Sequence, residues 1–237
     1  MNEITEIRLV AGLGFLFVLY SLWMGQMTAR GLPDGYRNPV LALELVKNAS
    51  DIKQILGAEH GRAGEFIKKS TYKDFGYIAV YAVFFIWVSM LLSRMPFPSA
   101  RSVGFAGAAC AASAAVLDFI EDRGMLRAIA GEASDSLANS IRYPSLGKWA
   151  FLFVFSLLVG VLLIARRSVF WLPGFCFLAA GVIGLAGVIL NLLRPKFYWT
   201  FPAATIGLGV GVVILSFVLI LRPRSCWARI LCLSAES

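Results

Sequence analysis

Charged residues are scarce in this chain. Of its 237 residues only 15% are charged, whereas 59% are hydrophobic. A soluble globular domain carries about 25% charged residues. One soluble domain of this length could not bury so much apolar surface, and exposed patches of that size would aggregate. The shortage of charge therefore excludes an ordinary soluble protein and indicates a chain whose solvent is lipid.

Histidines and paired cysteines are lacking as well. The single histidine, His60, cannot build the multi-histidine metal centres of membrane desaturases, hydrolases or haem cytochromes. The cysteines form no CxxC pair and have no histidine nearby; they are Cys110, Cys176, Cys226 and Cys232. This pattern favours two packing thiols and a free pair near the C-terminus over a metal site or a disulfide framework. We therefore expect no bound metal and no cofactor.

The positive charge of the chain does not indicate nucleic acid. The net charge is +8, but the basic residues lie almost entirely between apolar runs, where lipid headgroups attract them. The sequence has no basic block interleaved with exposed aromatic residues and no nucleic-acid fold signature. The expected partners are membrane lipids, with a small-molecule or lipid ligand and a protein of a membrane complex as further possibilities, and no nucleic acid.

Six apolar runs predict six membrane-spanning helices, since each has close to the twenty residues that a bilayer requires. The runs cover about residues 9–27, 75–93, 102–121, 149–165, 170–193 and 201–221. The expected fold class is all-α: a polytopic integral membrane protein with one membrane domain over residues 1–237 and a short tail over 222–237. Trp149, Trp171 and Trp199 fall at the expected span ends, where amphipathic rings prefer the headgroup level.

The first run is predicted to be a retained helix and not a signal peptide. Glu3, Glu6 and Arg8 precede it, which is not a basic leader, and no A-x-A cleavage pattern follows. Six spans place both termini on one face, which we call the first face. More of the 22 basic residues fall on the second face, whereas their density in short loops favours the first face as cytoplasmic. The cysteines of the tail tip the prediction toward cytoplasmic termini.

Residues 28–74 form the one substantial polar segment and are expected to be a small helical cap. Asn38 followed by Pro39 predicts the start of a short helix through about residue 47. Ser50 could cap a second helix that ends at Gly57, with its apolar side chains on one face. Residues 64–73 are predicted to lead helically into the next span. Such a cap could lie on the membrane surface.

The third run carries the best candidate functional residues. It opens with closely spaced glycine, alanine and serine residues, which let helix backbones approach, so this helix is expected to be central. It ends with Asp118, Glu121 and Asp122, whose spacing places three carboxylates on adjacent turns of one helix face. Ionised carboxylates at that depth are costly unless they are paired, hydrated or face a cavity.

Candidate partners for these carboxylates lie at the same end of neighbouring spans. Asp74, Tyr77 and Tyr81 form a stripe at helical spacing at the start of the second span, and Asn191 and Arg194 stand at the end of the fifth. All these groups belong to the second face, as does Lys148. The pattern predicts a polar vestibule beneath the cap, with a cavity beside Asp118 that binds a small amphiphilic or cationic molecule. The protein would then be a transporter or an accessory subunit of a membrane complex.

Two other interpretations of the same residues stay open. In the first, Asp118 and Glu121 are simply interfacial, Asp122 and Arg123 are in water, Lys148 or Arg194 pairs with the carboxylates, and the protein is a scaffold. In the second, Asp118 and Glu121 act as the acid and base of a metal-independent membrane enzyme. Against an enzyme, the chain has no Ser-His or Cys-His nucleophile arrangement and no glycine loop for phosphate.

The expected location is the cell membrane, which the chain crosses several times. The segments Leu43-Glu44-Leu45 and Tyr72-Lys73-Asp74-Phe75, with Leu117-Asp118-x-x-Glu121, resemble segments of bacterial membrane proteins. The resemblance indicates a bacterial inner membrane and carries no activity with it.

Overall fold

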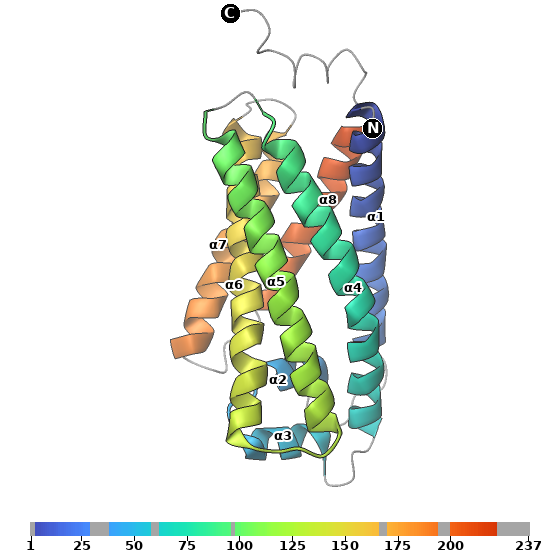
Figure 1. Cartoon of the computed structure of the whole chain (residues 1–237), viewed down its shortest axis with the longest axis vertical. Helices are drawn as coiled ribbons and strands as arrows, with labels where there is room; N and C mark the ends of the chain where they lie inside the picture. Colours follow the sequence, from blue (N-terminus) through green and yellow to red (C-terminus); the bar gives the residue numbers. More distant parts are fainter. Residues whose placement is uncertain are drawn as a thin grey trace, which may run out of the picture. The chain divides into compact units, whose positions relative to one another are not determined.

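The computed structural model of this protein is all-helical. It describes residues 3–28, 38–57, 62–95, 98–165, 170–193 and 200–221, and these ranges contain helices and no strand. The helices are α1 (Glu3–Thr28), α2 (Pro39–Glu44), α3 (Ala49–Leu56), α4 (Arg62–Leu92), α5 (Ala100–Ile129), α6 (Asp135–Ala165), α7 (Trp171–Leu193) and α8 (Thr200–Leu221) (Figure 1). Six of them, α1 and α4 to α8, are long and apolar enough to cross a membrane. The predicted fold class is confirmed, and the chain is a polytopic integral membrane protein.

Helices α5 and α6 are longer than the sequence predicted. The third span was expected to end near residue 121 and the fourth to begin near 149, but α5 continues to Ile129 and α6 begins at Asp135. Trp149, expected at the start of the fourth span, therefore lies within α6 and not at the start of that helix. Pro144 and the polar residues around it resemble a connection in the sequence. In the structure Pro144 lies inside α6, which continues although proline cannot donate a backbone hydrogen bond.

The cap is partly as predicted. Asn38 caps α2 by accepting a hydrogen bond from the backbone N–H of Leu41, with Pro39 at the first helical position. The residue that caps α3 is Asn48 and not Ser50, because the Asn48 side chain accepts from the backbone N–H of Asp51.

The ends of the cap differ from the expected bounds of residues 28–74. The end of α3 at Gly57 is confirmed; this residue has a φ of 76°, a conformation that glycine adopts without steric cost. Helix α4 already begins at Arg62, so the predicted helical lead-in to the second span is confirmed and belongs to a membrane helix rather than to the cap.

The chain divides into two compact units. Unit 1 comprises residues 1–18, 80–112 and 150–237, and unit 2 comprises residues 19–79 and 113–149. Helices α1, α4, α5 and α6 contribute residues to both units. The two units differ in chemistry, because the described part of unit 1 is largely aromatic and aliphatic, whereas unit 2 holds most of the buried charge.

Unit 1 has an aromatic core and closely packed helices. The rings of Phe85 and Phe155 have centroids 4.5 Å apart. A Cβ added at Gly160 would lie 2.7 Å from the backbone nitrogen of Leu178, so the absence of a side chain lets α6 and α7 approach. Gly181 is equally restricted, since its Cβ would lie 2.8 Å from the Phe153 carbonyl oxygen. Gly181 of α7 thus marks a second place where two helices pack closely.

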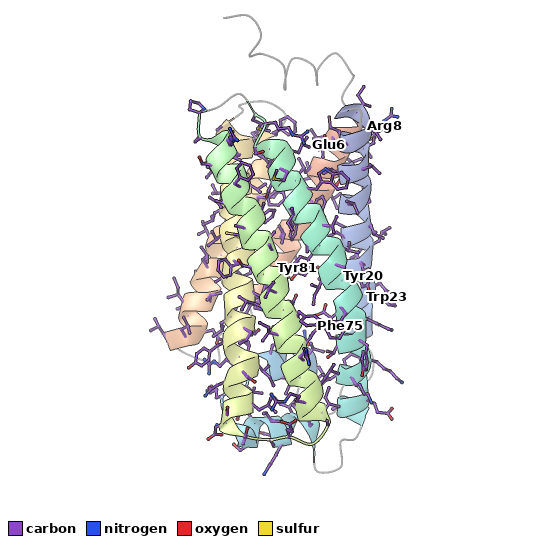
Figure 2. All side chains as sticks on the ribbon, in the orientation of Figure 1. Glu6, Arg8, Tyr20, Trp23, Phe75 and Tyr81 are labelled. Atoms are coloured by element: carbon purple, nitrogen blue, oxygen red, sulfur yellow. The ribbon has the colours of Figure 1, made fainter. Side chains whose placement is uncertain are left out.

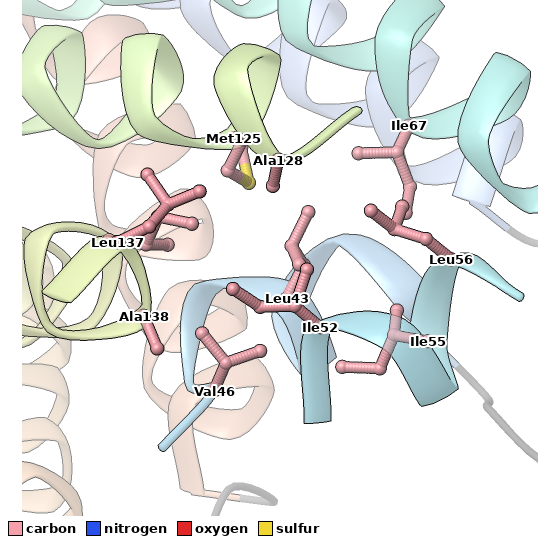
Figure 3. Packing of buried hydrophobic residues seen from close by; sticks show 11 residues of the cluster. Leu43, Val46, Ile52, Ile55, Leu56, Ile67, Met125, Ala128, Leu137 and Ala138 are labelled. Carbon is pink, nitrogen blue, oxygen red and sulfur yellow. The ribbon is translucent and has the colours of Figure 1, made fainter. Parts of the chain in front are cut away.

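Unit 2 contains a second apolar core that joins the cap helices to the ends of the long helices (Figure 3). Its buried members come from α2 and α3, from the segment between them, and from α4, α5 and α6. They are Leu43, Val46, Ile52, Ile55, Leu56, Ile67, Met125, Ala128, Leu137, Ala138 and Ile141. The apolar face of α3 thus packs on protein, which differs from the expectation that the cap could rest on the membrane surface.

Candidate functional site

A buried lysine in unit 2 gathers carboxylates from two other helices. Lys148 of α6 is only 4% exposed. Its Nζ lies 2.6 Å from Asp118 Oδ1, 2.9 Å from Glu121 Oε2 and 3.6 Å from Glu44 Oε1. Buried ion pairs of this kind persist only when the attraction between the charges offsets the cost of taking them out of water.

Helix α5 supplies three of the carboxylates. Asp118 is 4% exposed, and Glu121 and Asp122 are 0% exposed. Their helical spacing places them on one face, as predicted. The alternative in which Asp122 is already in water is wrong, because α5 runs on for two turns beyond it and the core of unit 2 covers this face.

Neighbouring residues explain how Lys148 reaches Asp118. A Cβ added at Gly147 would lie 2.8 Å from the side chain of Leu117, so a larger residue there would push α6 away from α5. Gly147 therefore lets α6 pack against Leu117 of α5, and the next residues in each helix, Lys148 and Asp118, are brought together. The scaffold interpretation predicted that Lys148 or Arg194 pairs with the carboxylates, and the pairing with Lys148 is confirmed.

Glu44 is a member of the site that sequence reasoning missed. It lies at the end of α2 and is 7% exposed. Its Oε2 accepts hydrogen bonds from Ser145 Oγ at 3.3 Å and from Trp149 Nε1 at 3.2 Å, both of α6. The available signal was its position between Leu43 and Leu45, both buried, which places the carboxylate in an otherwise apolar segment.

Asp74, on α4, lies near the carboxylates of α5. One carboxylate oxygen each of Asp74, Asp118 and Asp122 lie within 4.8 Å of one another. Asp74 is partly exposed, whereas the other two are buried. Phe75 of α4 is labelled in Figure 2. Its ring packs against that of Phe119 with centroids 5.4 Å apart, so the residues next to Asp74 and Asp118 hold α4 against α5.

Tyr77 lies one turn beyond Asp74 and is fixed by the end of α1. Its hydroxyl is 2.9 Å from Ser21 Oγ. The neighbouring Tyr20, labelled on α1 in Figure 2, donates a hydrogen bond to the carbonyl of Lys73 at 2.8 Å. Its hydroxyl occupies the space that a Cβ at Gly76 would need. The start of α4 is thereby tied to α1 beside the carboxylates.

The structure therefore brings together Asp74, Asp118 and Glu121 of the predicted site residues, with Tyr77 on the same helix as Asp74. Tyr81 and Asn191 are both buried and belong to unit 1. Arg194 lies outside the described residues. Glu44, Asp122 and Lys148 are additions to the predicted set.

The acidic cluster, defined as Glu44, Asp74, Asp118, Glu121 and Asp122 around Lys148, has more negative groups than positive ones. If all were ionised, five carboxylates would face one ammonium group. Uncompensated charge in a medium of low dielectric constant is very costly, so protons or a cation must balance the excess.

Some oxygens of the acidic cluster also lack hydrogen bonds. Both oxygens of Asp122 are buried and accept no hydrogen bond from the part of the chain that the structure describes. Glu121 Oε2, by contrast, lies 2.9 Å from Lys148 Nζ. Buried polar atoms are nearly always satisfied, so each such atom calls for an explanation.

An exposed pair in the same unit shows the contrast. Arg127 binds Glu132 through two nitrogens, with the shortest contact at 2.7 Å, and both side chains are largely in solvent. The hydrogen bonds from Arg127 hold the pKa of the Glu132 carboxyl below its ordinary value. The Glu132 carboxylate thus has a cation of its own, whereas Glu44, Asp118 and Glu121 of the acidic cluster share Lys148.

Such an arrangement can hold a positive charge that enters from outside the chain. Comparison with known proteins gives no independent guide to its identity: no family model, no curated protein and no solved structure matches this chain.

Proposed function

We propose that this integral membrane protein binds a small cation or a small cationic molecule at the acidic cluster of unit 2. The observation that carries the proposal is the excess of buried carboxyl groups over the single Lys148. Binding would serve transport across the membrane or an accessory role in a membrane complex.

The excess is difficult to explain as a device for stability alone. A structural ion pair needs one carboxylate for one lysine, and each further buried carboxylate adds its own desolvation cost. Replacing such groups with apolar residues of similar size is often neutral or stabilising. Ionisable groups inside a membrane protein are therefore functional candidates, and here they come from α2, α4, α5 and α6 to one place.

The burial of Asp118 and Glu121 supports a ligand role over an interfacial one. Both would point into bulk water if they only anchored a helix end at the membrane surface, and both are at most 4% exposed. The proposal includes the cavity predicted beside Asp118. In it Tyr77 would orient the ligand, whereas Tyr81 and Asn191 belong to unit 1 and Arg194 lies outside the described residues.

The test is thermal unfolding of the purified protein in detergent with a panel of cations. The panel contains alkali metal ions, divalent metal ions, spermidine and a tetraalkylammonium ion, each at several concentrations and at constant ionic strength. A cation that binds only the folded state raises the midpoint of unfolding with its concentration. We expect at least one class to do so with the natural protein and not with Asp118→Asn.

The control for that test is Glu132→Gln, which removes an exposed carboxylate outside the acidic cluster. It should respond to the cation as the natural protein does. If no cation stabilises the natural protein, while Asp118→Asn raises its stability, the carboxylates are balanced by protons alone. The cation proposal is then wrong, and the scaffold interpretation becomes the better one.

An enzymatic role is the second candidate, and one observation favours it. Asp118 and Glu121 both contact the ammonium group of Lys148, so a proton could pass between acid and base within one buried group. The test compares Asp118→Asn and Glu121→Gln in a strain with a measurable phenotype, by lipid and metabolite profiling at equal protein level. Loss of one product would establish an enzyme, and loss of cation binding with no missing product would support the first proposal.

A further inference from the structure

We infer that Asp74, Asp118 and Asp122 form a binding site for a hard divalent metal ion of the Mg²⁺, Mn²⁺ or Ca²⁺ class. The inference rests on the proposed cation-binding function and narrows the cation to a metal ion. The sequence alone predicted no metal site, because it has one histidine, no CxxC pair and no repeated acidic motif for Mg²⁺. These ions prefer oxygen ligands, and the three aspartates come from two different helices.

The spacing of the three carboxylates suits an ion between them. One oxygen from each lies within 4.8 Å of the other two. A point between three such oxygens is at most about 2.8 Å from each of them. Calcium binds oxygen at about 2.3–2.6 Å, so it fits with a small movement of the side chains. Magnesium, at about 2.0–2.1 Å, requires the three carboxylates to move closer together.

Asp122 supplies an independent observation that points to a ligand. It is 0% exposed, and neither of its oxygens accepts a hydrogen bond from any residue that the structure describes. An ionised carboxylate has about four acceptor positions. A metal ion between Asp122 and its two neighbours would occupy acceptor positions that the protein itself leaves empty.

Ser70 shows the same lack of hydrogen bonds one helical turn before Asp74. Its Oγ is buried and has no hydrogen-bond partner among the described residues. Residues four apart share a helix face, so this hydroxyl belongs to the same side of α4 as the Asp74 carboxylate. A hydrated ion would bring water that such a hydroxyl could bind.

Lys148 and the inferred ion serve different members of the acidic cluster. The lysine lies within 4.0 Å of Glu44, Asp118 and Glu121. Within the described ranges, Asp74 and Asp122 form no ion pair with a lysine or arginine. Asp118 belongs to both groups, since a carboxylate can accept from an ammonium group and bind a metal ion at the same time. The ion and Lys148 together would supply three positive charges for the five carboxylates of the acidic cluster, and protons would balance the remaining two.

The chain also offers a close control for charge. Glu121 is adjacent to Asp122 on α5, is equally buried and carries the same charge, but it contacts Lys148 and is outside the aspartate triad. If Asp122 coordinates the ion directly, its loss should weaken metal binding more than loss of Glu121. If the site only attracts positive charge, the loss of either carboxylate should weaken binding equally.

The experiment is a Mn²⁺ titration of the full chain in detergent after treatment with a chelator, followed by electron paramagnetic resonance. We expect one tightly bound Mn²⁺ per chain, displaced by Ca²⁺ or Mg²⁺. Asp122→Asn should weaken Mn²⁺ binding at least about tenfold, the loss that even supporting groups of metal sites produce. Glu121→Gln should weaken it by a clearly smaller factor. Asp74→Asn is the second ligand variant, in case Asp122→Asn does not fold.

Two results would overturn the inference. Equal weakening by Glu121→Gln and the aspartate variants would mean that the acidic cluster attracts charge without coordinating an ion. Failure of the natural protein to bind Mn²⁺, with stabilisation by spermidine or the tetraalkylammonium ion intact, would reject the metal and leave the cation proposal standing. If no cation of the panel stabilises the natural protein, the alkali metal ions included, both proposals are wrong.

Discussion

Lys148 Nζ and Asp118 Oδ1 lie 2.6 Å apart, although the two residues are separated by 30 positions in the chain and both are almost fully buried. The pair joins α5 to α6 at the place where Gly147 and Leu117 pack. It also fixes where the remaining carboxylates meet, because Glu44 and Glu121 are held by the same ammonium group. Lys148 is thus the residue on which the electrostatics of unit 2 depend most.

Removal of the Lys148 charge should destabilise the protein strongly. Lys148→Met keeps most of the side-chain volume and leaves buried carboxylates without their cation, a change that costs about 3–5 kcal/mol for buried pairs. The measurement is thermal or denaturant unfolding in detergent. The loss should shrink at acidic pH, because protonation neutralises the carboxylates.

Lys148→Arg is the matched control for this variant. It retains the positive charge and should lose less stability than Lys148→Met, although its planar group fits the site less well. A Lys148→Met protein as stable as the natural one at neutral pH would show that protons already balance the carboxylates.

Loss of Glu44 should release the cap helix α2. Glu44→Ala removes the hydrogen bonds from Ser145 and Trp149 together with the ion pair to Lys148. We expect faster hydrogen exchange of the backbone over residues 38–57, measured by mass spectrometry, and little change in α7 and α8. Glu65→Ala, at an exposed residue of α4, is the control. Unchanged exchange over the cap would mean that its apolar core alone holds it.

Small residues of unit 1 should differ sharply in their tolerance of a methyl group. At Gly160 a Cβ would lie 2.7 Å from the nitrogen of Leu178 and 2.9 Å from the oxygen of Gly174, both backbone atoms of α7. We expect Gly160→Ala to cost about 1–3 kcal/mol through overpacking. At Gly209 of α8 a Cβ would meet nothing within 4 Å, so Gly209→Ala should leave stability unchanged or slightly higher. Equal effects in unfolding measurements would contradict this account of helix packing.

Membrane topology can be tested with single cysteines in a variant that lacks the native ones. Cysteine at Lys53 of α3 and at Arg142 of α6 should react with a membrane-impermeant reagent from the same side of the membrane. Cysteine at Arg8, on the predicted first face, should react from the opposite side. Labelling of positions 53 and 142 from opposite sides would refute the six-span arrangement.

The sequence predicts the spans well because lipid imposes a simple requirement of length and hydropathy. It fails where a membrane helix continues past its apolar stretch. Residues 122–129 and 135–148 are polar enough to resemble a connection, yet they remain helical because their buried side chains pack on α2 and α3. That packing depends on contacts between segments far apart in the chain, which cannot be predicted from the local sequence of either segment.

The candidate site was predictable to the extent that it follows helix periodicity. The spacing of Asp118, Glu121 and Asp122 placed them on one face without any structure. Glu44 could not be found in this way, because its partners Ser145 and Trp149 are more than 100 residues later in the chain. Asp122 and Lys148 were left out of the predicted ligand site, because charged residues near an expected span end are ordinarily in water.

The position of Glu44 has a consequence for biogenesis. Its hydrogen-bonding partners lie 101 and 105 residues further along the chain, and Lys148 lies between them. At about 5–20 residues per second, a ribosome needs roughly 5–20 s to reach them after it has made α2. During that interval the Glu44 carboxylate must stay hydrated, so the cap docks only after α5 and α6 have been inserted. The cap helix α2 is therefore made before α5 and α6 but reaches its final position only after them.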